Sequence, residues 1–127
     1  MNIEHPNISI LKRFNPANLN TLADVLAEDF VWHYINPELS ELEGDYFGLF
    51  GLKDFFHKIA SRTSGSFKVN PRFIIPMGDE LIITHVKDTL SLDGKPMEID
   101  AIVVWCIIND QIKEAWDIPI AHTAKMI

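Results

Sequence analysis

A single carboxylate, Asp117, lies near the end of a long and mostly apolar stretch, residues 94–118. This stretch is rich in β-branched and aromatic residues on both sides of the turn pair Asn109-Asp110, so it predicts two neighbouring strands. Both strands are apolar on both faces, which indicates a sheet that is covered on both sides. A carboxylate buried against apolar side chains has a raised pKa and can act as a general acid or base. Asp117 is therefore the first candidate for chemistry.

The composition limits the classes of function that need to be considered. The chain has 127 residues, of which 47% are hydrophobic and 23% charged, as expected for one globular domain over residues 1–127. Eighteen acidic and eleven basic side chains give a net charge of −7, which disfavours nucleic-acid binding. No apolar stretch reaches the ~20 residues of a membrane-spanning helix. The N-terminal residues do not resemble a secretory signal and Cys106 is the single cysteine, so we expect a cytoplasmic protein.

Helical periodicity dominates the first half of the chain and strand patterns dominate the second. Apolar residues recur at helical spacing over residues 6–14, 18–29 and 51–62, which predicts three helices, the first two as a hairpin. The predicted strands are residues 30–35, 67–77, 80–92, 96–108 and 111–118. Helices gathered ahead of a run of strands indicate an α+β fold, in which three N-terminal helices pack on one face of a strongly curved antiparallel sheet.

Several short segments, in this order and at this spacing, carry a family resemblance. They are Ala27-Glu28-Asp29, Trp32-His33, Gly44-Asp45-Tyr46-Phe47-Gly48, Thr63-Ser64-Gly65-Ser66-Phe67, Asp93-Gly94-Lys95-Pro96 and Ile112-Lys113-Glu114-Ala115-Trp116-Asp117. Over nearly the whole chain, this pattern resembles the nuclear transport factor 2-like superfamily, and within it the SnoaL-like and ketosteroid-isomerase-like proteins. The resemblance implies a cone-shaped, cystatin-like sheet around the helices, with a pocket at its wide end and frequent homodimerisation. It does not imply one reaction, because one fold hosts many functions.

Ketosteroid isomerase activity is excluded by the residues that occupy the working positions of that family. The match places Ile10 at its helix-one tyrosine, Tyr34 at its general-base aspartate and Val103 at the protonated aspartate of its oxyanion hole. A mechanism that needs a base and two acidic donors cannot run on Ile, Tyr and Val.

The same match, combined with the alternation of side chains along a strand, predicts which residues point into the pocket. The inward residues are Thr84, Val86, Asp88 and Leu90 of one strand, Ile99, Ala101, Val103 and Trp105 of the next, and Lys113, Ala115 and Asp117 of the last. Val86, Val103 and Asp117 are expected side by side, with Trp105 as an indole wall for a flat ligand. Alternatively, Asp117 lies at a solvated rim, where it accepts hydrogen bonds or pairs with Lys113 or with a cation of a helix.

Candidates for assisting Asp117 lie in the first strand and in the loop after it. Either His33 or Tyr34 must face inward, as a titrating imidazole or as a phenol that donates to an oxyanion, and the sequence does not decide which. Trp32 is predicted as a wall of the core or pocket, and Tyr46 and Phe47 as lining of the entrance. In the structural alternative, His33 is satisfied by the backbone, and Tyr46 and Phe47 merely pack the loop against the third helix.

The opposite faces of the same strands predict an interface. Ile102, Val104, Cys106 and Ile108 form an apolar row that a monomer would leave in water, so we expect a homodimer through the outer sheet face. His85 shares this outward face. The remaining histidines show no shared metal-ligand spacing, and no phosphate-cradling or dinucleotide-binding motif occurs, so neither a metal nor a cofactor is predicted.

Two functions remain open at this stage. The first is a cofactor-independent cyclase, isomerase, dehydratase or hydrolase that acts on a small hydrophobic organic ligand through Asp117, with Tyr34 or His33 as donor. The second is a non-catalytic ligand-binding or protein-interaction module of the same fold.

Overall fold

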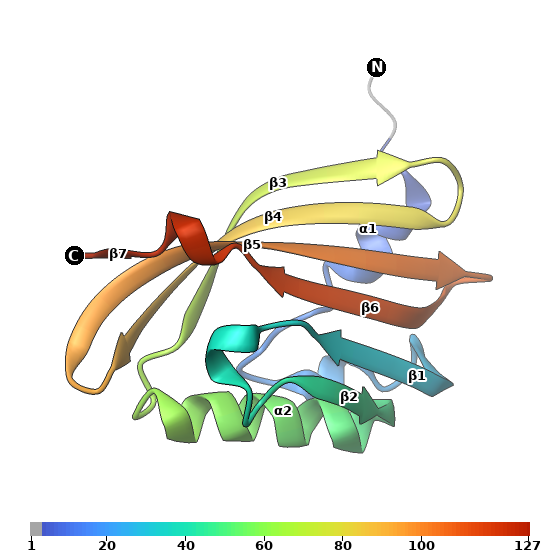
Figure 1. The fold of residues 1–127 in the computed structure, drawn as a ribbon. Coiled ribbons are helices and arrows are strands. Elements are labelled where there is room, and N and C mark those ends of the chain that lie inside the picture. The colour runs from blue at the N-terminus through green and yellow to red at the C-terminus, as the bar shows by residue number, and fades with distance from the viewer. Residues whose placement is uncertain (1–3) are drawn as a thin grey trace.

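The computed structural model describes residues 4–127 as a curved mixed sheet with two α-helices (Figure 1). The helices are α1 (Pro6–Leu11) and α2 (Gly48–Arg62), and 3₁₀ turns cover Leu19–Leu22, Pro37–Leu39 and Ala121–Thr123. The strands are β1 (Leu26–Tyr34), β2 (Gly44–Phe47), β3 (Lys68–Met77), β4 (Leu81–Leu92), β5 (Lys95–Ile108), β6 (Gln111–Pro119) and β7 (Lys125–Met126). The order across the sheet is β2-β1-β6-β5-β4-β3, and β7 pairs with β5. The predicted α+β class and the four C-terminal strands are confirmed.

Tight turns with positive φ angles fix the register of the long hairpins. Asn109 and Asp110 both have positive φ, at 52° and 63°, and they join β5 to β6. Asp93 and Gly94 do the same between β4 and β5, with φ of 53° and 79°. Such paired left-handed residues form the two-residue turns whose twist matches that of antiparallel strands. The register that follows sets Asp117 opposite Val103 and Asp88 opposite Ile99.

The prediction of a second N-terminal helix over residues 18–29 is wrong. Leu19 and Leu22 lie buried in a single 3₁₀ turn, and the chain then enters β1 at Leu26. The backbone oxygen of Val25 accepts a hydrogen bond from the amide of Ile112 at 2.7 Å, so pairing with β6 takes the place of a further helical turn. This pairing is parallel, which makes the sheet mixed and not antiparallel throughout. Long-range pairing has overridden the local helical pattern.

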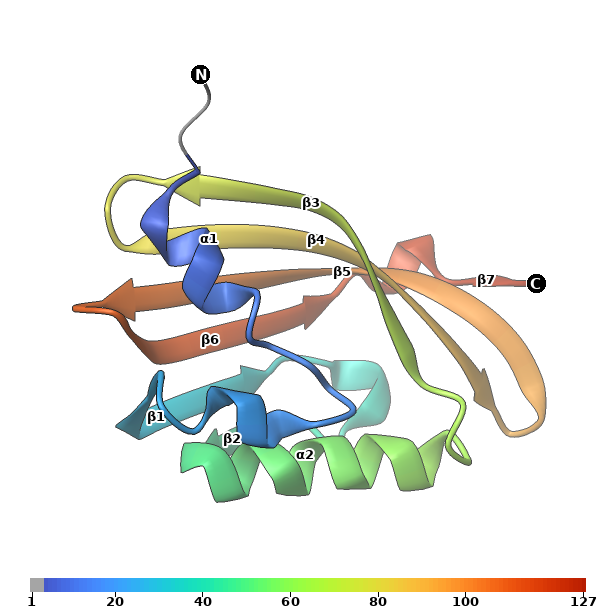
Figure 2. The same cartoon turned by 180° about the vertical axis from the view of Figure 1, so that it is seen from behind.

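The core lies between α2 and the inner face of the sheet. Leu52, Phe55 and Ile59 are buried on one face of α2, where Phe55 packs against Trp32 and Tyr34 of β1 at ring distances of 5.6 and 4.7 Å. The β4–β5 hairpin bends toward the C-terminal end of α2, as Figures 1 and 2 show from opposite sides. Together, α2 and the bent sheet enclose an interior between them. Neither helix in residues 4–127 is long and apolar enough to cross a membrane.

Candidate functional site

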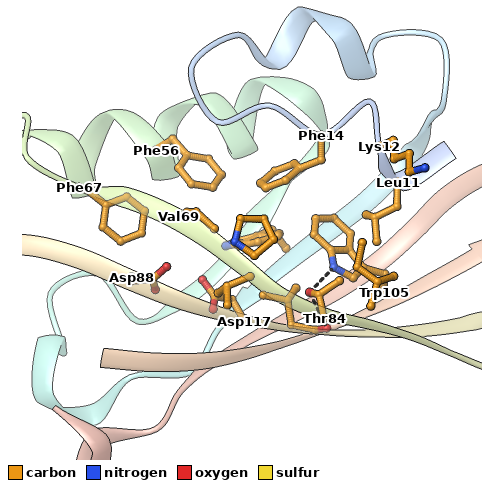
Figure 3. A pocket seen from close by; sticks show the side chains of 15 residues that line it. Leu11, Lys12, Phe14, Phe56, Phe67, Val69, Thr84, Asp88, Trp105 and Asp117 are labelled. Atoms are coloured by element: carbon orange, nitrogen blue, oxygen red, sulfur yellow. Dashed lines mark hydrogen bonds between the residues drawn. The ribbon is translucent and has the colours of Figure 1, made fainter. Parts of the chain in front are cut away.

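A cavity of about 260 Å³ opens between the inner face of the sheet and the aromatic side chains that cover it. Figure 3 shows the rings of Phe14, Phe56 and Phe67 on one side and the carboxyl groups of Asp88 and Asp117 on the other. The other wall residues are Leu11, Lys12, Trp32, Val69, Pro71, Ile74, Thr84, Val86, Val103 and Trp105. A mostly apolar hollow with a few polar groups, near the small end of the usual range of ligand pockets, suits a small organic molecule.

Asp117 lies in the middle of the sheet, where neighbouring strands hold it on both sides. In β6 it pairs with Val103 of β5 and with Tyr34 of β1, and only 8% of its surface is exposed. Burial raises the pKa of its carboxyl group well above the ordinary 3.8, and the charge of Asp88 raises the pKa further. Because the ionised form is disfavoured, Asp117 holds its proton to a higher pH than an exposed aspartate does, and it takes a proton up more strongly after losing it.

Asp88 is a second buried carboxyl group in the same cavity. It lies on the inner face of β4 with 6% exposure, and its Oδ1 atom has no hydrogen-bond partner among residues 4–127. Burial, followed by the charge of Asp100, raises the pKa of Asp88 to about 7. Because two interacting buried carboxyl groups do not readily ionise together, Asp88 and Asp117 as a pair hold tightly to the second of their two protons after the first is lost.

An aromatic wall closes the side of the cavity opposite Asp88. Trp105 donates a hydrogen bond from Nε1 to Oγ1 of Thr84 at 3.1 Å (Figure 3), and the hydroxyl of Thr84 donates to the backbone oxygen of Val103 at 3.2 Å. Trp32 packs 5.6 Å from Trp105, but its own buried Nε1 finds no acceptor within the described chain. Buried indole N–H groups usually have a partner, so the unpaired N–H group of Trp32 is an exception.

Tyr34 faces inward beside Asp117 and lines a second cavity of about 360 Å³. Its hydroxyl oxygen accepts a hydrogen bond from Nδ2 of Asn36 at 2.8 Å. Burial raises the pKa of Tyr34 well above 10, and the charges of Asp117 and Asp88 raise the pKa further, although the hydrogen bond from Asn36 opposes them. The hydroxyl therefore keeps its proton and can act as a donor.

The family of the chain follows from a match between its sequence and a family model. Residues 9–115, which include most of the cavity wall, match the family model of the SnoaL-like domain. The chain belongs to the SnoaL-like family. A search of curated proteins found no match to its sequence.

Solved structures similar to this SnoaL-like protein share its fold at low identity. TerC co-crystallised with polyporic acid is 18% identical with a TM-score of 0.78, over 92% of this chain and 93% of TerC. IdmH, a putative polyketide cyclase from Streptomyces antibioticus, is 16% identical with a TM-score of 0.71, over 94% and 95% of the two chains. An NTF2-like protein of unknown function from Burkholderia pseudomallei is 17% identical with a TM-score of 0.79, over 94% of each. At these identities the likeness shows the fold.

Most of the residues proposed for the site of the SnoaL-like protein from its sequence lie together. Trp32, Val86, Asp88, Val103, Trp105 and Asp117 all line the first cavity, and Tyr34 lines the second. Ala101 is fully buried but forms part of neither wall. Ala115 is buried as predicted, but Lys113 does not point inward, because a bulge opposite Cys106 and Ile107 turns Ile112 into the core in its place.

The inward candidate of the first strand is Tyr34, and His33 is excluded from the cavity. His33 lies on the outer face, stacks on Trp116 and hydrogen-bonds through Nδ1 to Asp45 at 2.6 Å and through Nε2 to Glu114 at 2.5 Å. Burial opposes protonation of its imidazole, but these two carboxylates outweigh burial and raise the pKa of His33. The histidine ties β2 and β6 to β1 and has a structural role.

The loop residues Tyr46 and Phe47 do not line either cavity. Tyr46 donates its hydroxyl proton to the backbone oxygen of Leu42 at 2.6 Å and packs edge-on against Phe55 of α2. Phe47 is 67% exposed. Their positions correct the prediction that they form the entrance, because β2 pairs with the edge of β1, where Tyr46 packs against the core beside α2 and Phe47 faces solvent.

Sequence analysis missed the part of the wall that comes from α1, α2 and β3. Phe67, Val69 and Pro71 alternate along the start of β3 and could have been found by that alternation. Ile74 breaks the pattern, because the register of β3 against β4 shifts between Pro71 and Phe73. No three His, Cys, Asp or Glu side chains in residues 4–127 lie together as a metal site would require.

Proposed function

We propose that this SnoaL-like protein binds a small, largely apolar organic molecule in the Asp117 cavity and transfers a proton at that molecule without a cofactor. Cyclisation, isomerisation, dehydration and hydrolysis are reactions that such a transfer can drive. The observation that carries the proposal is the carboxyl group of Asp117, buried against aliphatic and indole side chains with a pKa raised well above 3.8.

The proposed roles of the side chains follow from their protonation states. Asp117 donates its proton to the ligand or, once ionised, removes a proton from the ligand. The apolar surroundings of Asp117 make its carboxylate a stronger base than a carboxylate in water. Tyr34 stays protonated beside Asp117 and stabilises negative charge that develops on a ligand oxygen. The N–H group of Trp32, which lacks an acceptor within residues 4–127, holds a further acceptor atom of the ligand.

Structural relatives support an organic ligand but do not specify it. TerC was crystallised with polyporic acid, and IdmH is described as a putative polyketide cyclase. Both share this fold with the chain. With identities below 20%, neither relative identifies the substrate of this chain.

A non-catalytic binding module is the second candidate, and one observation favours it. The Oδ1 atom of Asp88 and the Nε1 atom of Trp32 are buried without partners in the described chain, and a bound ligand could satisfy both without reacting. Binding alone would then account for the cavity.

Hydrogen–deuterium exchange distinguishes the two functions. Ketones and 1,3-diketones with acidic C–H groups are incubated with the protein in D₂O, and loss of the C–H signal is followed by proton NMR. We expect exchange faster than in buffer alone, because Asp117 removes the proton and solvent deuterium replaces it. Compounds that bind, as judged by broadening of their signals, but exchange no faster than in buffer would assign the protein to the binding class.

We also propose that the outer sheet face pairs two copies of the chain in the cytoplasm. Ile102, Val104, Cys106 and Ile108 are half-buried there, and Phe73 on β3, which stacks on His85 next to Ile102, is 62% exposed. An apolar face of this kind is stabilised by self-association. Sedimentation equilibrium is expected to give twice the mass of the 14.5 kDa chain, and replacing Val104 by Lys is expected to give the single mass. A monomeric wild type would refute this interface.

A further inference from the structure

The two cavities follow one row of side chains along the sheet. Alternate residues of β4 line the first cavity at Thr84 and Val86 and the second at Leu90 and Leu92, and Asp88 between them lines both. Strand β5 repeats this arrangement, with Val103 and Trp105 in the first cavity and Met97 and Ile99 in the second. At about 3.3 Å per residue, the eight steps from Thr84 to Leu92 correspond to roughly 26 Å along β4. The two cavities therefore lie end to end along β4 and β5.

Phe67 and Asp88 form the neck between the two cavities, because both residues line both hollows. Figure 3 shows the Phe67 ring facing the Asp88 carboxyl group across the end of the first cavity. On either side of this neck the walls are mainly aliphatic and aromatic. A ligand that passes through it meets a carboxyl group at its middle and apolar surface at both ends.

The neck holds one hydrogen-bond acceptor that the described residues leave unpaired. Asp88 offers an Oδ1 atom that is buried and has no partner among residues 4–127. The charge that acts on Asp88 is that of Asp100 on β5, and the charge of Asp88 in turn raises the pKa of Asp117 on β6 and of Tyr34 on β1. The cation of the first wall, Lys12, is paired with Glu4 at 2.9 Å. A buried acceptor that lacks a donor favours a ligand that brings one.

We propose that the two cavities form one elongated site for a mainly apolar molecule that carries a hydroxyl group near its middle, donated to Asp88 at the neck. The inference rests on the ligand cavity of the proposed function, but not on proton transfer at Asp117. One molecule occupies both cavities, and the protein selects it by the position of the hydroxyl group along the carbon chain of the ligand.

Isomeric ten-carbon alcohols test the position of the hydroxyl group. Binding of 5-decanol, 1-decanol and 5-decanone is measured by titration calorimetry at pH 8.5, with tryptophan fluorescence as a second readout, since Trp32 and Trp105 line the wall. We expect 5-decanol to bind about tenfold more tightly than either other compound, as one hydrogen bond to a charged group would give. The expected stoichiometry is one molecule per chain.

The variant Asp88→Leu is expected to lose the preference for 5-decanol while keeping the apolar cavity. The variant Asp24→Leu, at an exposed position, should keep the preference for 5-decanol. The Asp88→Leu substitution removes a buried group without a partner in the described chain, so folding should not suffer. Equal affinity for the three compounds, or two molecules per chain, would overturn the elongated site but not the proposed function. If none of the three compounds binds, the elongated site and the proposed function are both overturned.

Discussion

Replacing Asp117 by Asn is expected to lower the rate of hydrogen–deuterium exchange in bound carbonyl compounds by about 10²- to 10⁴-fold, the usual contribution of a positioned acid or base. The amide has nearly the same shape as the carboxyl group but neither takes up nor releases a proton near neutral pH. Asp117 is buried between Val103 and Tyr34. Protonated Asp117 is neutral, so its replacement by the neutral Asn side chain changes no charge. The variant should therefore fold and still bind ligand.

The matched control for this variant is Asp24→Asn. Asp24 is exposed and lines neither of the two cavities, so its variant should exchange at the wild-type rate. Ligand affinity is measured for both proteins by calorimetry, to separate loss of chemistry from loss of binding. If Asp117→Asn retains the wild-type exchange rate, Asp117 is not the acid or base.

The second large effect concerns stability. Asp88→Asn is expected to raise the free energy of unfolding by about 4 kcal/mol at pH 9, because the difference between the ordinary pKa of 3.8 and the folded value of about 7 corresponds to that amount. The unfolded chain loses this proton near pH 4, whereas the folded chain holds it up to about pH 7. Stability therefore falls as the pH rises from 4 to 7, and above 7 the loss is complete.

Urea unfolding between pH 4 and pH 9 measures this effect. The wild type should lose stability over the interval from 4 to 7, and Asp88→Asn should lose much less, with the residual slope due to Asp117. Asp24→Asn should follow the wild type. Identical slopes for the wild type and Asp88→Asn would show that Asp88 is solvated and ionises normally.

The C-terminal half of the fold could be predicted because its local signals agree with its tertiary pairing. The turn residues Asn109-Asp110 and Asp93-Gly94 fix two hairpins, and the alternation between them assigns Asp88, Val103 and Trp105 to one face. The same alternation placed Asp117 on the inner face, but it did not decide between a buried position and a solvated rim. Side-chain period and turn chemistry are local properties, so a sequence carries them directly.

The features that could not be predicted depend on contacts between distant segments. Leu22 and Leu26 have helical spacing, but the pairing of β1 with β6 draws Leu26 into a strand. The bulges in β3 and β6 change which residues face inward, and no residue type near them signals the change. His33 and Tyr34 could not be separated, because their parity depends on where β1 begins. The second carboxyl group, Asp88, was placed correctly but not recognised as interacting with Asp117.

The central claim is that Asp117 is a carboxyl group buried in a ligand cavity, where its pKa is raised well above 3.8. The most direct test is a carbon-detected NMR titration of its side-chain carboxyl group in the ligand-free protein, with Asp117→Asn used to assign the signal. The account predicts a pKa well above 3.8, with a further change in the signal when Asp88 ionises. A pKa near 3.8, as for an exposed aspartate, would contradict it.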